Sequence, residues 1–128
     1  MGAPKYPQSF QTASVHFATA NTLRDGTGTI ATLITGIAAG TAVQRVRIAA
    51  TGNTTDNVIR LWKNDGSYRL LDEIRVPAIT ATAPLLVWRT VYKYPPGEEL
   101  MLNGVGESMR VSTNNAEGYD ACAEGQGF

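Results

Sequence analysis

The chain has 128 residues, about the length of one domain, and 43% of them are hydrophobic, which is enough to build a core. Eleven basic residues balance eleven acidic ones, and this zero net charge argues against a protein that coats nucleic acid. A single histidine and a single cysteine exclude an internal disulfide and make most zinc sites and nucleophilic triads hard to assemble. We therefore expect neither an enzyme nor a metal or cofactor site.

The sequence predicts no membrane segment. The N-terminal residues lack the apolar run of a signal peptide. The weakly polar residues 27–43 are interrupted by Gly28, Gly36 and Gly40, which opposes a transmembrane helix. The expected product is made in the cytoplasm and either stays there or leaves it as part of a larger particle.

The first twelve residues differ from the rest of the chain. They contain Gly2, Pro4 and Pro7 and show no hydrophobic periodicity. We expect residues 1–12 to form an extended arm that frays or orders on a partner, with Tyr6 and Phe10 as candidate contacts. Residues 13–128 are predicted to form a single β-sandwich domain.

Apolar and polar residues alternate with a period of two along most of the remaining chain, which is typical of strands. One parity of each predicted strand is mostly apolar, and this indicates sheets with one face on a core. The predicted strands lie around residues 15–17, 30–34, 45–50, 58–63, 67–76, 86–92, 109–113 and 119–124.

The clearest predicted element is a hairpin over residues 58–76. Asp65-Gly66 separates its two strands, and glycine tolerates the positive φ that such tight turns need. On the returning strand, Asp72 shares the parity of apolar residues. An acidic residue in that row predicts a bulge or bend near Leu71, or an edge strand.

Turn residues recur about every 8–12 residues, which is the spacing of a β-sandwich or barrel. The alanine-rich residues 38–50 are not predicted as a helix, because Gly40 and β-branched residues such as Val43 and Ile48 oppose one. We predict an all-β fold of eight or nine strands, most simply an antiparallel jelly roll or a related two-sheet β-sandwich.

The charges are unevenly distributed. Residues 1–97 carry ten basic and five acidic groups, a net of +5, and residues 98–128 carry one basic and six acidic groups, a net of −5. One interpretation is that the acidic segment folds back as a neighbouring strand, so that the charges interleave. The other is that a basic face and an acidic face meet between subunits.

Candidate catalytic groups are few. His16 lies between Val15 and Phe17, so its side chain is expected to face outward. A catalytic base needs partner groups that converge on it, and the sequence indicates none for His16. Cys122 is interpreted as a packed or inert thiol, although a pair with His16 is conceivable. The polar residues around Asp25 and Asp65 do not match the ligand spacing of a calcium loop and are interpreted as turns.

Two features favour a binding surface. Arg45, Arg47 and Arg60, with Arg69 and Arg75, are the polar alternates of neighbouring strands and form either one basic stripe or an ordinary solvated face. Trp62 has the parity opposite to that of Ile59 and Leu61, so it is expected to point outward and mark an interface.

The aromatic residues leave two interpretations open. One is a sugar-stacking platform, and the other is ordinary packing in the core or at a subunit interface. The residues concerned are Trp62, Tyr68, Trp88, Tyr92, Tyr94 and Tyr119.

Several segments together resemble a family of small virion proteins of tailed bacteriophages. These segments are residues 43–55 (VQRVRIAATGNTT), 58–61 (VIRL), 65–66 (DG), 68–71 (YRLL), 73–74 (EI), Pro77, 96–97 (PG), 110–117 (RVSTNNAE) and 123–128 (AEGQGF). The resemblance covers residues 26–128 and leaves out the predicted arm. It implies a jelly roll similar to capsid decoration, or cement, proteins, and it implies no catalytic residue.

The expected function is therefore that of a non-enzymatic virion protein that binds the outer capsid surface and stabilises the head by bridging major capsid subunits. The expected partners are the major capsid protein and further copies of this chain in a dimer or trimer, with no direct contact to nucleic acid. Alternatives are a tail, neck or head-fibre protein, or a carbohydrate-binding surface module. The candidate contacts are Tyr6, Phe10, Arg45, Arg47, Arg60 and Trp62.

Overall fold

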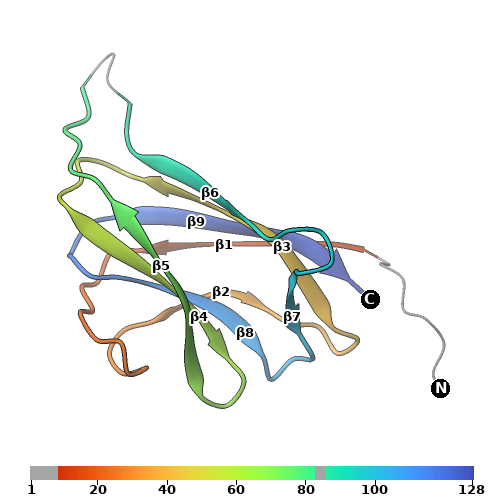
Figure 1. Ribbon diagram of the computed structural model, residues 1–128. Helices are drawn as coiled ribbons and strands as arrows, with labels where there is room; N and C mark the ends of the chain where they lie inside the picture. The colour runs from red at the N-terminus through yellow and green to blue at the C-terminus, as the bar shows by residue number, and fades with distance from the viewer. Residues whose placement is uncertain (1–8, 83–85) are drawn as a thin grey trace.

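The computed structural model describes residues 9–82 and 86–128, and its regular elements are nine β-strands (Figure 1). In chain order they are β1 Ser9–Phe17, β2 Ala31–Thr35, β3 Thr41–Ala50, β4 Asn57–Asn64, β5 Tyr68–Val76, β6 Arg89–Lys93, β7 Leu100–Leu102, β8 Ser108–Thr113 and β9 Tyr119–Gly127. The predicted all-β class and the predicted number of strands are confirmed.

The strands form two antiparallel sheets. Sheet A has the order β1-β9-β3-β6, with β7 paired to β3 beside β6, and sheet B has the order β2-β8-β4-β5. The chain passes from one sheet to the other after β1, β2, β3, β5, β7 and β8, so most neighbours within a sheet are distant in sequence. This alternation between two four-stranded layers, with β7 as an addition, is a jelly roll, and the predicted fold class is confirmed.

The core lies between the two sheets. Strand alternation places one parity of β3 and β9 against one parity of β4 and β8. Most of the deeply buried apolar residues come from these central strands, with Val76 of β5 and Leu102 of β7 beside them: Val43, Val46, Ile48, Ile59, Leu61, Met109, Val111, Ala121 and Ala123.

The predicted hairpin is β4–β5. Leu61 pairs with Asp72 and Trp62 pairs with Leu70, so Leu71 is an extra residue without a partner. The predicted bulge near Leu71 is therefore confirmed. Strand β5 is also an edge strand of sheet B, and a bulge in such a strand opposes pairing with another chain.

Strand β1 begins at Ser9, six residues before the predicted strand around residues 15–17 and four residues before the predicted start of the sandwich domain at residue 13. Residues 9–12, assigned to the arm, pair with β9 from Ser9 opposite Gly127 to Thr12 opposite Glu124. Polar residues at Ser9, Gln11 and Thr12 obscure the alternation there. The remainder of the predicted arm, residues 1–8 with Tyr6, lies outside the described residues.

Candidate functional site

The outward side of sheet A, called the A face below, is a regular array of side chains. The register aligns four residues from β1 with four each from β9, β3 and the β6/β7 pair. Its four rows are Phe10, Gln126, Ala42, Met101; Thr12, Glu124, Arg45, Lys93; Ser14, Cys122, Arg47, Val91; and His16, Asp120, Ala49, Arg89.

Arg45 and Arg47 share one carboxylate on the A face. Arg45 Nη2 lies 2.8 Å from Glu124 Oε2, and Arg47 Nε lies 2.7 Å from Glu124 Oε1. Hydrogen bonds from Arg47 and then Arg45 hold the pKa of Glu124 below its usual range. Because Glu124 belongs to the acidic C-terminal segment and lies on the strand beside β3, the interleaving of charges is confirmed at this position.

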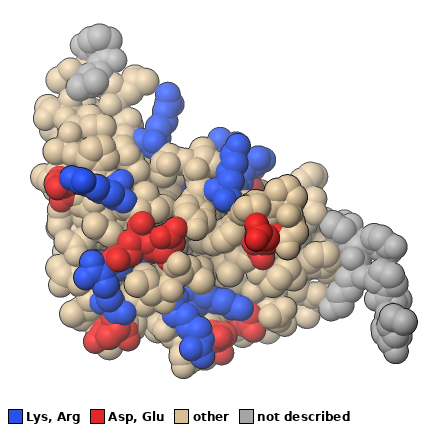
Figure 2. All heavy atoms as spheres, in the orientation of Figure 1, with Lys and Arg blue, Asp and Glu red and all other residues tan. Residues whose placement is uncertain are grey.

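Two further cations on the A face have no acidic partner within residues 9–82 and 86–128. Arg89 and Lys93 are exposed on β6, and among the described residues neither forms an ion pair. Lys93 lies directly opposite Arg45 in the register. In Figure 2 the blue side chains along the upper margin have little red beside them, whereas blue and red alternate lower down.

The A face is hollowed. A trough of about 1010 Å³ runs across β1, β9, β3 and β6. Its outward-facing lining includes small residues such as Ser14, Ala49 and Cys122, with charged groups beside them. His16 lies in the same trough, is exposed as predicted, and places Nδ1 2.7 Å from Asp120 Oδ1.

The outward side of sheet B is covered. Residues 18–30, called the covering segment below, run beside β8, with Asn21 N donating to Thr113 O at 2.8 Å. They continue to β5, where a Cβ added to Gly26 would lie 2.7 Å from Tyr68 Cβ. Backbone approach this close needs glycine, and the positive φ of Gly26 needs it as well.

The covering segment buries Arg60. The Arg60 guanidinium is 1% exposed and donates from Nε to Glu73 at 2.8 Å, from Nη1 to Asn21 O at 3.0 Å and from Nη2 to Asn114 at 3.2 Å. Arg24 binds the same Glu73 carboxylate at 2.8 Å. Hydrogen bonds from Arg24, and then from Arg60, hold the pKa of Glu73 below its usual range.

The predicted basic stripe is wrong for Arg60. Arg45 and Arg47 belong to sheet A, whereas Arg60 belongs to sheet B and is buried under the covering segment. Arg69 and Arg75 also lie in sheet B, where each pairs with a nearby aspartate.

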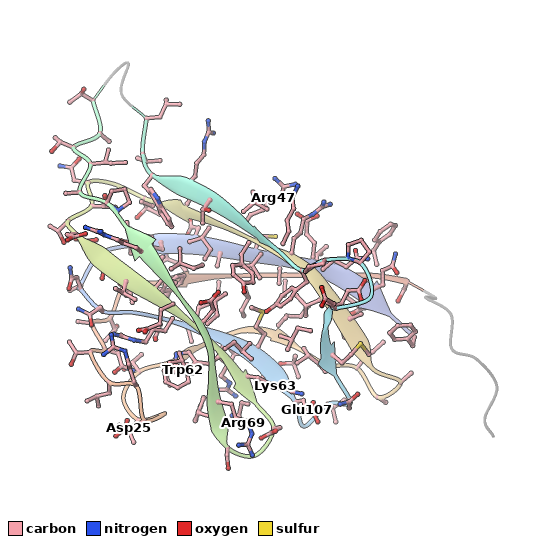
Figure 3. All side chains as sticks on the ribbon, in the orientation of Figure 1. Asp25, Arg47, Trp62, Lys63, Arg69 and Glu107 are labelled. Atoms are coloured by element: carbon pink, nitrogen blue, oxygen red, sulfur yellow. The ribbon has the colours of Figure 1, made fainter. Side chains whose placement is uncertain are left out.

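The predicted exposure of Trp62 is also wrong. Its parity is as expected, because Ile59 and Leu61 face the core, but Trp62 is only 1% exposed. Its Nε1 donates to Ser112 Oγ at 3.0 Å, and its ring packs edge-on against Tyr68. Figure 3 shows Trp62 within the molecule, toward the segment that carries Asp25, whereas Arg47 projects away from sheet A.

Of the two interpretations left open for the aromatic residues, the sugar-stacking platform is wrong. Trp62 and Tyr119 are buried, and the other four are half-buried. Trp88 packs edge-on against Tyr119, and Tyr92 packs edge-on against Tyr94, with ring centroids 6.1 Å and 5.3 Å apart. The core interpretation of these residues is therefore the correct one.

The loops considered for calcium are turns stabilised by side chains. Asp25 accepts hydrogen bonds from the Thr27 hydroxyl and backbone N–H, and Asn64 accepts one from Gly66 N. The described residues contain no cluster of three metal-binding side chains. Over the same part of the chain, no helix is long and apolar enough to cross a membrane.

Sequence reasoning missed Arg89 and Lys93 as members of this site. Their alternation with Thr90 and Tyr92 is visible in the sequence, and it indicates a strand with a cationic side. The register that places this strand beside Arg45 and Arg47 comes only from the fold.

Comparison with known proteins yields structural similarity alone. No family model and no curated protein matches the sequence. A chain of the cyanophage Pam1 capsid asymmetric unit is 14% identical, with a TM-score of 0.42, and the match covers 100% of this chain and 93% of that one. A chain of the extra small virus (XSV) VLP of the giant freshwater prawn Macrobrachium rosenbergii is 11% identical, with a TM-score of 0.40, covering 98% and 84%. At these values neither similarity says what this chain does.

Proposed function

We propose that this chain is a non-enzymatic structural protein of a virus particle, a decoration or cement protein that binds the outer capsid surface and bridges major capsid subunits. The observation that carries the proposal is the contrast between the two outward sides of the jelly roll. Sheet B is covered by the chain's own residues 18–30, whereas the A face is open, hollowed and cationic at one edge.

The scaffold suits a role of this kind. The two hydrogen-bonded sheets, together with the buried ion pair between Arg60 and Glu73, make a rigid support that holds the A face in one geometry. Many copies on a symmetric lattice convert modest contacts into strong retention through avidity. The sequence resemblance to small virion proteins of tailed phages supports the same role.

The proposed contacts are Tyr6, Phe10, Arg45 and Arg47. Phe10 is 83% exposed at the corner of the A face, and Arg45 and Arg47 lie at its centre. Tyr6 lies outside the described residues and enters the proposal on the sequence alone. Arg60 and Trp62 are removed from the set because both are buried.

The deciding experiment measures the copy number of this chain in purified particles, relative to the major capsid protein, by quantitative mass spectrometry. Cement function predicts a copy number comparable to that of the major capsid protein. A much lower copy number, equal to the number of subunits in one small ring or at a few vertices, favours the alternative of a tail, neck or head-fibre protein. Absence from the particle overturns both proposals.

A second experiment tests which face binds. Particles stripped of this protein are mixed with the purified chain, and retention and the thermal stability of the head are measured. Replacing Arg45 and Arg47 together with glutamine is expected to reduce both. The matched control replaces Arg69 and Arg75, which are exposed and ion-paired on sheet B. Equal behaviour of the two variants contradicts binding through the A face.

A further inference from the structure

Strand β6 ends sheet A with a free edge. Its partner on one side is β3, and no described strand lies on its other side (Figure 1). An unpaired edge presents backbone N–H and C=O groups that another strand can bind. This edge belongs to the A face, but it would bind a partner through the backbone as well as through side chains.

The alternation of hydrogen bonds between β3 and β6 identifies the residues whose backbone N–H and C=O groups point toward the free edge. Ala50 N donates to Trp88 O at 2.8 Å, so this directly opposite pair is hydrogen-bonded across β3 and β6. Opposite pairs in antiparallel sheets alternate between bonded and non-bonded. The backbone groups of Arg89, Val91 and Lys93 therefore point away from β3, while their side chains lie on the A face.

The charges beside β6 are unbalanced. On the inner flank of β3, strand β9 places Glu124 opposite Arg45. On the other flank, β6 places Lys93 opposite Arg45, and like charges directly opposite each other are destabilising. Cationic columns on β3 and β6 thus adjoin, and acidic residues lie beside only one of them. On the free side of β6, no described residue supplies an acidic neighbour to its cations.

We infer that the free edge of β6 binds an extended segment of a partner polypeptide that carries acidic, apolar and acidic residues at alternate positions. Added antiparallel to β6, such a segment hydrogen-bonds to Arg89, Val91 and Lys93. Its two carboxylates then lie opposite Arg89 and Lys93, and its apolar residue lies opposite Val91, which is 41% exposed.

Sheet A already contains this kind of pairing. Strand β9 carries Asp120, Cys122 and Glu124 on the A face, and Glu124 binds the arginines of β3. The proposed segment presents to the outside of β6 a pattern similar to the one that β9 presents to β3, with two acidic residues and an apolar residue where β9 has Cys122.

A second copy of the described chain does not fit as the partner. None of its other edge strands, β1, β2, β5 and β7, carries two carboxylates four residues apart. The cations of β6 also repel a second copy of β6, which protects this edge from self-association. The occupant is therefore a different polypeptide, and the inference specifies its chemistry whether or not it belongs to a capsid.

The test uses the full-length chain and a short synthetic peptide. The peptide carries glutamate, valine and glutamate at alternate positions, with threonine at the positions between them. Control peptides carry glutamine or lysine in place of glutamate. Two charge pairs are expected to make the glutamate peptide bind about tenfold more tightly than the glutamine peptide, as measured by calorimetry at low salt. The lysine peptide is expected not to bind.

A charge reversal sharpens the test. The variant that combines Arg89→Glu with Lys93→Glu is expected to lose binding of the glutamate peptide and to gain binding of the lysine peptide. The matched control, Arg69→Glu combined with Arg75→Glu, reverses two exposed cations on the edge strand of sheet B and is expected to bind as the unaltered chain does. Gain of the lysine peptide also shows that the reversed variant is folded.

Amide hydrogen exchange, followed residue by residue by NMR, distinguishes strand addition from loose charge attraction and needs no variant. The glutamate peptide is expected to slow exchange at Arg89, Val91 and Lys93 and to leave Thr90 and Tyr92 unchanged. Absence of peptide binding, equal affinity for all three peptides, or protection outside β6 overturns the inference. Because no particle is involved, these outcomes are independent of the copy number in virions.

Discussion

The outward sides of the two sheets use similar residues in opposite ways. On sheet A, Arg47 binds a carboxylate on the neighbouring strand and remains 55% exposed. On sheet B, Arg60 does the same, with the same 2.7–2.8 Å geometry, and is 1% exposed. The difference arises from residues 18–30, which cross the outer side of sheet B, whereas no described segment crosses the A face.

This comparison teaches that strand parity fixes the direction of a side chain and leaves its burial undetermined. Trp62 and Arg60 point away from the core, as their parity requires, yet both are fully buried because a second layer covers them. The covered side therefore contributes to stability, and the open side remains available for binding. Four predictions test this division of labour.

The largest effect is expected at Trp62. Trp62→Ala removes a buried indole together with its hydrogen bond to Ser112 and is expected to lower the free energy of unfolding by about 3–5 kcal/mol. Urea denaturation monitored by circular dichroism measures the loss. The control Val91→Ala, at a half-exposed site on the A face, is expected to change stability by less than about 0.5 kcal/mol. Similar losses at the two sites would contradict the division between the faces.

The next largest effect compares two guanidiniums. Arg60→Met leaves Asn21 O and Asn114 Oδ1 without their buried donor and is expected to cost about 3 kcal/mol, because breaking a buried charge network is expensive. Arg47→Met makes the same chemical change at an exposed ion pair and is expected to cost less than about 1 kcal/mol. Equal midpoints in urea for the two variants would show that the covering segment contributes little.

Much of the fold is readable from the sequence. Asp65-Gly66 and the acidic residue at position 72 suffice to predict the β4–β5 hairpin and its bulge, because turn chemistry and alternation are local properties. The interleaving of Glu124 with basic residues is one of the two arrangements that the opposite charges of two parts of the chain allow, and the fold decides between them at this position. The spacing of the turns predicts eight or nine strands, and that number suits a jelly roll or a related two-sheet β-sandwich.

The candidate site is less predictable, because it depends on contacts between distant residues. Arg45, Arg47 and Arg60 look equivalent as strand alternates, and only the assignment of β3 and β4 to different sheets separates them. The covering segment has no regular secondary structure and no hydrophobic periodicity. Its role depends on single groups, such as Asn21 O on Arg60 and Arg24 on Glu73, that no local pattern predicts.

A third prediction concerns pH. The folded protein holds the pKa of Glu73 below its usual value, chiefly through Arg24 and also through Arg60. The ionised carboxylate therefore stabilises the folded state above the ordinary glutamate pKa, and this contribution disappears as the pH falls through the lowered value. Glu73→Gln is expected to be less stable at neutral pH and to lose less stability on acidification. Urea midpoints across the acid range measure both slopes, and parallel slopes would refute the role assigned to Glu73.

The smallest effect is expected to have the opposite sign. Lys93 lies opposite Arg45 without an acidic neighbour among the described residues, so Lys93→Thr removes a repulsion and introduces a β-branched residue into a strand. The variant is expected to be more stable by about 0.3 kcal/mol at low salt, and the gain should shrink as salt screens the repulsion. Thermal unfolding at two salt concentrations measures it. A loss of stability would mean that Lys93 has a supporting contact within the subunit. A gain of stability would mean that the charge of Lys93 on the A face destabilises the isolated fold. This is expected where a partner supplies the carboxylate that pairs with it.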